Sequence, residues 1–308
     1  MPENHLPLNR EKFTYTLCKI VDYVNSQKEI KICILVGSQA RSDTPADRWS
    51  DIDLVFFTDE PERYLGTSKW VEEIAGLKPV LTFIEGTAVG DKLERRVLFD
   101  NGQDVDFSIY PLSATDYIID DNNASEEAIG VLRRGFKVIK DELDLVSVGL
   151  NELIHSEYAI KKGRNWRLII SQEKFQEAVN DFLYHYLLEI RKLRRGELWT
   201  AIMGSDCYMK GKLLQMIEWH MKIEKEGTVD IWHNGRFMEM WADESVLAEL
   251  QNAFSHYDRN DIESGLNSSL DLYVKLARGV ASKLGYGYPS EAENFVRKLA
   301  VIDSHYHI

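Results

Sequence analysis

Two acidic residues with strand spacing could bind a cation. Asp51 and Asp53 open the run DIDLVFF, and Ile52 lies between them. Side chains two apart on a strand share a face, so both carboxylates project to the same side while Ile52 points into the core. Two such carboxylates repel each other unless a cation lies between them. Although Asp-x-Asp alone is also common at a solvated strand end, oxygen-only ligands on one rigid strand suit Mg²⁺.

An anion-binding turn is predicted ahead of the acidic pair. The run Ile32–Val36 is apolar, largely β-branched and too short for a buried helix, which indicates a strand. Gly37 then permits a sharp turn, and Ser38 follows at an expected helix N-cap, so that N–H groups and a hydroxyl face a ligand. A turn of this kind beside paired carboxylates indicates a site for a metal-bound triphosphate, with Gly37 and Ser38 holding its β- and γ-phosphates.

The order of these motifs resembles the nucleotidyltransferase superfamily, in which Gly-Ser precedes Asp-x-Asp on the next strand. Further motifs extend the similarity over nearly the whole chain. They are DVDFSIYPL at 104–112, Trp219, Gly235-Arg236-Phe237 and LGYGYP at 284–289. Together with DIDLVFF they resemble the aminoglycoside 6-adenylyltransferase (streptomycin adenylyltransferase) family. One departure is that this family usually carries Arg directly after Gly-Ser, where this chain has Gln39, with Arg41 two residues later.

The resemblance implies an enzyme. The expected activity is Mg²⁺-dependent transfer of AMP from ATP to a hydroxyl of a streptomycin-like aminoglycoside, releasing pyrophosphate and giving antibiotic resistance. Two alternatives stay open. The same catalytic core could act on a lincosamide or another small alcohol, or the chain could be a toxin–antitoxin module that modifies a protein or tRNA.

The resemblance also implies further site residues. It expects a third carboxylate on a neighbouring strand, which we assign to Asp106 because Asp104 lies beside a turn. Asp106 would complete a metal site with Asp51 and Asp53 or accept the proton of the attacking hydroxyl.

Basic and acidic residues elsewhere could bind the two substrates. Arg41, Arg191 and Arg195 are candidates to neutralise the triphosphate, since Arg pairs well with phosphate oxygens. Asp181 matches an acidic family position and is a candidate to bind a cationic acceptor. The alternatives are helix-end arginines that face water and a solvated helix Asp.

The elements that would position these residues form an α+β pattern in the first half of the chain. The spacing of apolar residues predicts helices at 9–26, 64–75 and 113–134, and strands at 32–36, 51–57, 79–84, 92–99 and 104–112, with a short final strand or extended link at 135–139. Asn101-Gly102 is typical of a hairpin turn, so part of the sheet is antiparallel. We expect a nucleotidyltransferase catalytic domain with a mixed sheet and flanking helices at 1–149.

The second half of the chain is predicted to be all-α. Apolar residues recur at three-and-four spacing from Phe175 to Leu193 and in the segments that follow. An acidic patch after the last predicted strand indicates a surface link, with the boundary near Gly149. We therefore expect a helical substrate-binding domain at 150–308.

Charge and cysteine content restrict the partners. The 308-residue chain carries a formal net charge of −13, which disfavours a nucleic-acid backbone and suits ATP with a polycationic small-molecule acceptor. Its cysteines, Cys18, Cys33 and Cys207, are odd in number and widely spaced, which is typical of free thiols in a reducing compartment. Because no apolar run of spanning length occurs, we expect a cytoplasmic protein without a membrane partner.

Overall fold

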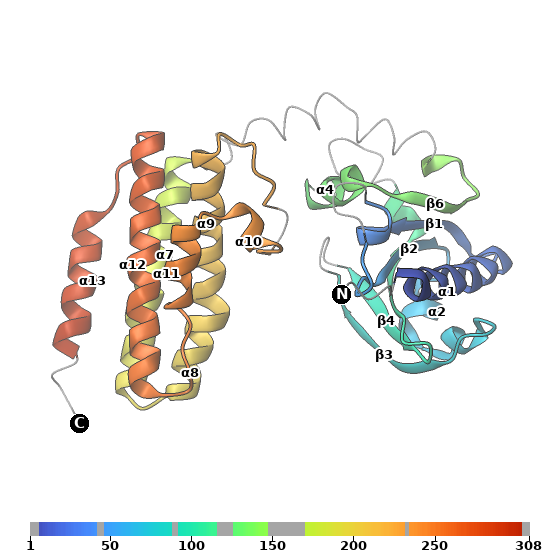
Figure 1. Cartoon of the computed structure of the whole chain (residues 1–308), viewed down its shortest axis with the longest axis horizontal. Coiled ribbons are helices and arrows are strands. Elements are labelled where there is room, and N and C mark those ends of the chain that lie inside the picture. The colour runs from blue at the N-terminus through green and yellow to red at the C-terminus, as the bar shows by residue number, and fades with distance from the viewer. Residues whose placement is uncertain are drawn as a thin grey trace. The chain divides into compact units, whose positions relative to one another are not determined.

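The computed structural model describes residues 6–41, 46–87, 92–115, 126–146, 170–231 and 234–303. The chain divides into two compact units, Met1–Lys162 and Gly163–Ile308 (Figure 1). The boundary predicted near Gly149 lies outside the described residues and stays a prediction. Among the described residues, no helix is both long and apolar enough to cross a membrane.

A mixed six-stranded sheet forms the centre of the first unit, in the order β3-β4-β5-β2-β1-β6. Strands β2 and β5 pair in parallel, and the other neighbours pair antiparallel. The strands are β1 (Ile30–Val36), β2 (Ile52–Thr58), β3 (Pro79–Gly86), β4 (Leu93–Phe99), β5 (Asp104–Pro111) and β6 (Lys137–Asp141).

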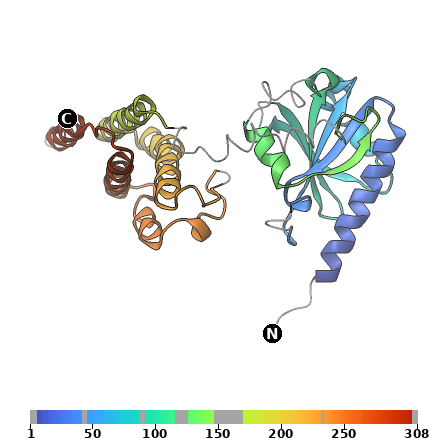
Figure 2. The ribbon, with the colours of Figure 1, turned by 90° about the horizontal axis from the view of Figure 1, so that it is seen from above.

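Helices cover both faces of this sheet because the central strands are apolar on both sides. On β1, Cys33 and Leu35 pack into a core with α1 (Leu6–Ser26), while Ile32 and Ile34 pack into a second core that includes Leu132. Leu132 belongs to α4 (Glu126–Arg134). Figure 2 shows α1 and α4 on opposite sides of the sheet.

One predicted helix differs from the structure, and a second can be compared only over its described residues. The helix expected at 64–75 is instead α2 (Pro61–Gly66) followed by a 3₁₀ segment, Lys69–Glu73, because Thr67 between them is extended. The helix expected at 113–134 is represented by a 3₁₀ turn at Leu112–Ala114 and by α4, and residues 116–125 lie outside the described part. For 64–75 the apolar spacing was therefore correct for one side facing the core but not for a continuous helix.

The second unit is helical, as predicted. Its core is formed by the apolar stripes of the long helices, including Phe182 of α7, Met216 of α9 and Leu270 of α12, each essentially without exposed surface. The elements are α7 (Gln172–Arg194), α8 (Leu198–Met203), a π-helix (Gly204–Met209), α9 (Lys210–Glu224), α10 (Met238–Trp241), α11 (Glu244–Gln251), α12 (Arg259–Leu284) and α13 (Ser290–Asp303). A mixed sheet followed by a helical region confirms the predicted α+β fold class.

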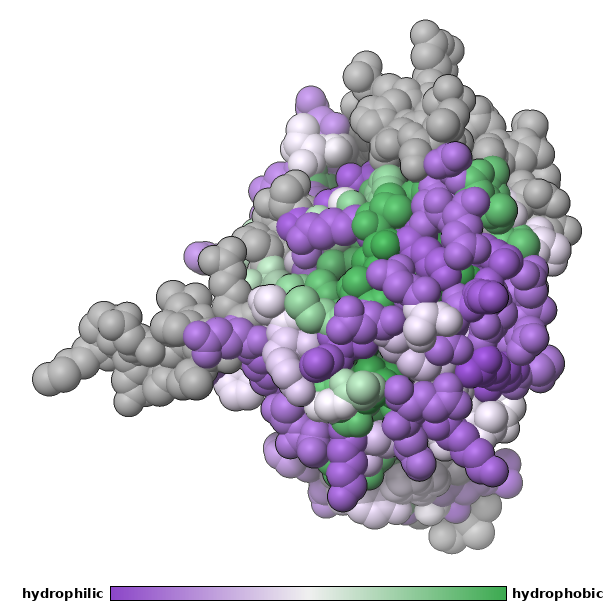
Figure 3. Space-filling model, turned by 90° about the vertical axis from the view of Figure 1, so that its right-hand side faces the viewer, coloured by the Kyte–Doolittle hydropathy of each residue, from purple (hydrophilic) through white to green (hydrophobic). Residues whose placement is uncertain are grey.

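The surface agrees with the acidic, polar composition. On the face shown in Figure 3, hydrophilic side chains surround a narrower apolar region. No covalent cross-link restrains either unit among the described residues, since Cys18, Cys33 and Cys207 are all free thiols.

Candidate active site

The turn after β1 brings a glycine against an aspartate. Gly37 begins a 3₁₀ turn, Gly37–Gln39, with φ +68°, a left-handed conformation that side chains other than glycine's rarely adopt. A Cβ at Gly37 would lie 1.8 Å from Oδ2 of Asp53, because Val36 and Asp53 are register partners between β1 and β2. Only glycine therefore allows the turn and the Asp53 carboxylate to occupy their present positions.

Ser38 offers a hydroxyl within this turn. The expectation that it caps a helix was wrong: Val36 is the N-cap residue, and no side chain caps the turn. The Ser38 Oγ atom is buried and has no hydrogen-bond partner among the described residues. A buried hydroxyl in that state normally has a partner, so this atom fits contact with a bound ligand.

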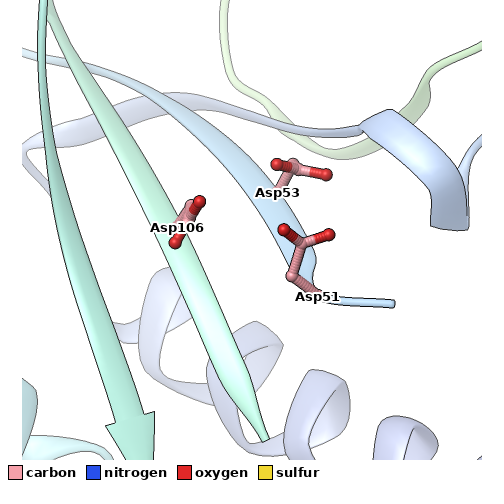
Figure 4. Close-up of side chains that lie close together, drawn as sticks. All are labelled: Asp51, Asp53 and Asp106. Atoms are coloured by element: carbon pink, nitrogen blue, oxygen red, sulfur yellow. The ribbon is translucent and has the colours of Figure 1, made fainter. Parts of the chain in front are cut away.

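Three carboxylates come together beside the turn. Asp53 of β2 and Asp106 of β5 are register partners in the parallel pair, and Asp51 immediately precedes β2. One oxygen from each of Asp51, Asp53 and Asp106 lies within 4.8 Å of the others. Figure 4 shows the three side chains gathered over neighbouring strands. A set of carboxylate oxygens fits a hard divalent cation such as Mg²⁺, so the residues present suit the implied metal.

The electrostatic environment separates Asp106 from an ordinary surface aspartate. Burial raises the pKa of Asp106 to about 7; the positive charge of Arg96 opposes this shift, and the negative charges of Glu94, Asp51 and Asp104 add to it. Asp104 itself is exposed at the start of β5. Asp106 is therefore the carboxylate of this strand that joins the cluster, and its environment resists ionisation unless a cation is added.

Two charged residues of β4 lie on the same face of the sheet as the three carboxylates. The Nε atom of Arg96 lies 3.5 Å from Asp106 Oδ2. The Oε1 atom of Glu94 accepts a hydrogen bond from Arg96 Nε at 2.9 Å and lies 2.7 Å from Arg96 Nη2. Sequence reasoning missed both residues. The signal was present, because Glu94 and Arg96 are two apart on a strand and share a face. Only the β4–β5 register, which pairs Arg96 with Asp106, shows that this is the face of the carboxylate cluster.

The predicted arginines lie in both units. Arg41 follows the Gly-Ser turn and donates its backbone N–H to the Gly37 carbonyl at 3.1 Å. Arg191 lies in the last turn of α7, and Arg195 is the C-cap residue of that helix. The Arg195 side chain is 74% exposed and pairs with Glu197 at 2.8 Å. Their contacts with a nucleotide stay predictions.

Asp181 on α7 already has partners within its own unit. Its carboxylate receives Lys212 Nζ at 2.7 Å and the Tyr208 hydroxyl at 2.9 Å, and it lies 2.7 Å from Nδ1 of His185. Burial opposes ionisation, but the hydrogen bonds from Lys212 and Tyr208 hold the pKa of Asp181 below its ordinary range. An acceptor ammonium group at this position would have to share the carboxylate with these donors.

Comparison with known proteins extends over nearly the whole chain. The family described as streptomycin adenylyltransferase matches residues 11–300. The aminoglycoside 6-adenylyltransferase of Bacillus subtilis is 21% identical over 90% of this chain and 93% of its own length. The enzyme of the same name from Campylobacter jejuni is 21% identical over 92% of each chain. The crystal structure of an aminoglycoside 6-adenyltransferase from Bacillus subtilis superposes with a TM-score of 0.42 at 17% identity, covering 94% of this chain and 97% of that one.

Proposed function

The chain belongs to the streptomycin adenylyltransferase family and is a nucleotidyltransferase enzyme, and from this premise we propose that it transfers AMP from ATP to a hydroxyl group of an aminoglycoside. Pyrophosphate is released and the modified antibiotic loses activity, which gives resistance. Streptomycin is the proposed acceptor. Because ATP is the co-substrate, we place the reaction in the cytoplasm.

The observation that carries this proposal is the carboxylate cluster beside the Gly-Ser turn. Asp51, Asp53 and Asp106 would hold Mg²⁺, which in such sites stabilises negative charge on the phosphates of the nucleotide. The buried Ser38 hydroxyl and the backbone of the turn would bind the β- and γ-phosphates. Because the three carboxylates repel one another, a bound cation would stabilise this arrangement.

The reaction requires one bond to form and one to break. The acceptor oxygen attacks the α-phosphorus, and the bond from that phosphorus to the oxygen bridging to the β-phosphate breaks, so that pyrophosphate leaves with the bonding electrons. The hydroxyl proton needs an acceptor. Asp106 is our candidate for that role, in addition to or in place of metal binding, because its carboxylate lies beside those of Asp51 and Asp53, and a bound cation would keep it ionised and able to accept a proton.

Arginines would complete the nucleotide site. Arg41 lies directly after the phosphate-binding turn, and Arg191 and Arg195 lie at the basic end of α7. We propose that they neutralise the charge of the triphosphate and of the leaving pyrophosphate, since a guanidinium can pair with two phosphate oxygens at once.

Recognition of the acceptor rests on charge. The net charge of −13 favours a polycation over a nucleic acid, and Asp181 is the proposed contact for an acceptor ammonium or guanidinium group. The alternative within the same chemistry is a lincosamide or another small alcohol. It is favoured by Gln39, which replaces the arginine that the family usually carries after Gly-Ser.

An acceptor screen tests the proposal. The purified full chain is incubated with ATP, Mg²⁺ and single acceptors, namely streptomycin, other aminoglycosides, a lincosamide and bulk tRNA. Pyrophosphate release is measured, and products are identified by mass. We expect an added AMP on streptomycin and no release by Asp53→Asn. Release with another small alcohol but not with streptomycin would keep the chemistry and reject the antibiotic.

The role of Asp106 is tested by separating metal binding from turnover. Asp106→Asn removes the proton acceptor but keeps one oxygen that can bind a metal. If Asp106 is chiefly the base, calorimetry will show only the small loss of Mn²⁺ affinity that removal of one nearby negative charge causes, while kcat falls by about 10²-fold or more. A large loss of Mn²⁺ affinity in Asp106→Asn would instead assign it chiefly to metal binding.

A further inference from the structure

Asp106 lies between a carboxylate and a guanidinium in the sheet. Strand β5 has β2 on one side and β4 on the other. Its Asp106 is the register partner of Asp53 across the parallel pair and of Arg96 across the antiparallel pair. Directly paired side chains on adjacent strands project to the same face. The position of the Asp106 carboxylate is therefore influenced from both sides, by a like charge and by an opposite one.

Arg96 is held chiefly by its own strand. Nε and Nη2 of Arg96 lie 2.9 and 2.7 Å from Glu94 Oε1, and Nε lies 3.2 Å from Glu85 of β3. The Nε–Oδ2 distance to Asp106 is 3.5 Å, which is an ion pair without a good hydrogen bond. Because the single Nε proton is directed to closer acceptors, Arg96 acts on Asp106 mainly through its charge.

Glu94 is the buried partner that holds the Arg96 guanidinium in place. Its side chain is 7% exposed, and its other oxygen lies 3.4 Å from the Ser108 hydroxyl of β5. A buried carboxylate is tolerated when a cation and hydrogen bonds satisfy it, so Glu94 and Arg96 depend on each other. As a pair they are neutral, and they place a fixed positive charge beside Asp106 without changing the total charge of the site.

We propose that Arg96 is a positioning residue of the reaction, held by Glu94 so that its positive charge orients the Asp106 carboxylate beside Asp51 and Asp53. The inference rests on the proposed nucleotidyl transfer for its kinetic consequence. Its electrostatic consequence concerns metal binding alone. Removing Arg96 makes the cluster more negative, and neutralising Glu94 makes it less negative. The affinity for a divalent cation should therefore move in opposite directions in the two variants.

The experiment compares Arg96→Met, Glu94→Gln and the double variant, each in the full chain. Calorimetry with Mn²⁺ in the absence of nucleotide should show tighter binding for Arg96→Met, weaker binding for Glu94→Gln and near-native binding for the double variant. With ATP and the acceptor found by the screen, kcat should fall by about 10²-fold in Arg96→Met and in the double variant, with a smaller change in KM for ATP. Arg96→Lys, which keeps the charge but not the planar fork, should recover part of that loss.

Arg95→Met is the matched control for loss of an arginine from the same strand. Arg95 faces the other side of the sheet, where its side chain donates to the carbonyl groups of Tyr64 and Leu65. This variant should be less stable to heat, yet it should bind Mn²⁺ as the native chain does. The double variant guards against misfolding, because it removes the ion pair without leaving a buried Glu94 carboxylate unpaired.

These measurements distinguish failure of the proposed role of Arg96 from failure of the proposed function. Mn²⁺ affinities that shift in the same direction in Arg96→Met and Glu94→Gln would overturn the role of Arg96, as would a double variant with native kcat. If the native chain transfers AMP to no acceptor, the proposed function fails, while the opposite shifts in Mn²⁺ affinity still decide whether Arg96 sets the charge around Asp106.

Discussion

In the first unit, three carboxylates gather within 4.8 Å of one another, whereas in the helical unit the single carboxylate of Asp181 is paired with two donors, Lys212 and Tyr208. Burial and neighbouring negative charges raise the pKa of Asp106 to about 7. At Asp181 the balance is reversed, since hydrogen bonds from Lys212 and Tyr208 outweigh burial and hold the pKa low. The same residue type is thus destabilised as an anion in one unit and stabilised in the other.

The difference separates a cluster of carboxylates that repel one another from a carboxylate that already has partners. Crowded carboxylates gain free energy when a cation binds, and that gain is available for binding and catalysis. A carboxylate already paired with Lys212 gains less from a further cation than the crowded carboxylates do, because the new cation competes with existing donors. Substitutions should therefore affect function most in the first unit and stability most in the second.

The largest effect is expected for Asp53→Asn. Removing this carboxylate should lower kcat by about 10³-fold or more, since it would remove charge stabilisation at the reacting phosphate. In metal-free buffer the melting temperature should stay level or rise, because a like-charge repulsion is relieved. Pyrophosphate release and thermal melts measure the two quantities. Near-native activity in both Asp53→Asn and Asp51→Asn would show that the carboxylate cluster of the first unit is not needed for turnover.

The next largest effect is expected for Gly37→Val. A side chain at φ +68° is strained, and its Cβ would displace the Asp53 carboxylate, which lies 1.8 Å from the position of that atom. We expect ATP affinity, measured by calorimetry, to fall sharply and turnover to fall by about 10²-fold, as displacement of a catalytic group does. Gly66→Ala, where an added Cβ meets no atom within 4 Å, is the control. Native ATP affinity in a folded Gly37→Val chain would show that the turn is only structural.

A smaller effect concerns pH and the free energy of unfolding without metal. Asp106 has a folded-state pKa of about 7, above the value of about 4 for an unfolded aspartate, so its protonated form is favoured by folding. Its contribution to stability is therefore complete below about pH 4 and is lost as pH rises towards about 7. Denaturant titrations of the metal-free chain from pH 4 to 8 should show this loss. Asp106→Asn should lack it, and saturating Mg²⁺ should reduce it.

The smallest effect is expected for Asp181→Asn. Loss of the contacts to Lys212 and Tyr208 should reduce the free energy of unfolding by about 1 kcal/mol, with turnover at saturating acceptor unchanged. If Asp181 also binds the acceptor, the acceptor KM will rise while the KM for ATP stays constant. Tyr208→Phe, which removes one donor and keeps the carboxylate, distinguishes the two roles. A loss of kcat comparable to that of Asp53→Asn would contradict the division between the units.

The sequence by itself determined the local parts of the site. Alternation along 51–57 places Asp51 and Asp53 on one face, and the apolar run before Gly37 requires a strand that ends in a turn. The change to three-and-four spacing after Phe175 determined the helical second half. These features depend on residues close together in the chain, whose geometry follows from the periods of strand and helix.

Only the tertiary structure decided which residues face one another across the sheet. Period-two alternation tells which side of a strand a residue faces, but not which strand lies beside it or in which register. The parallel pairing of β2 with β5 brings Asp106 to Asp53, and the pairing of β4 with β5 adds Arg96. The donors around Asp181 likewise come from segments 27 and more residues away. The charge balance of each carboxylate is therefore a property of the folded chain, because it depends on long-range contacts that no local pattern encodes.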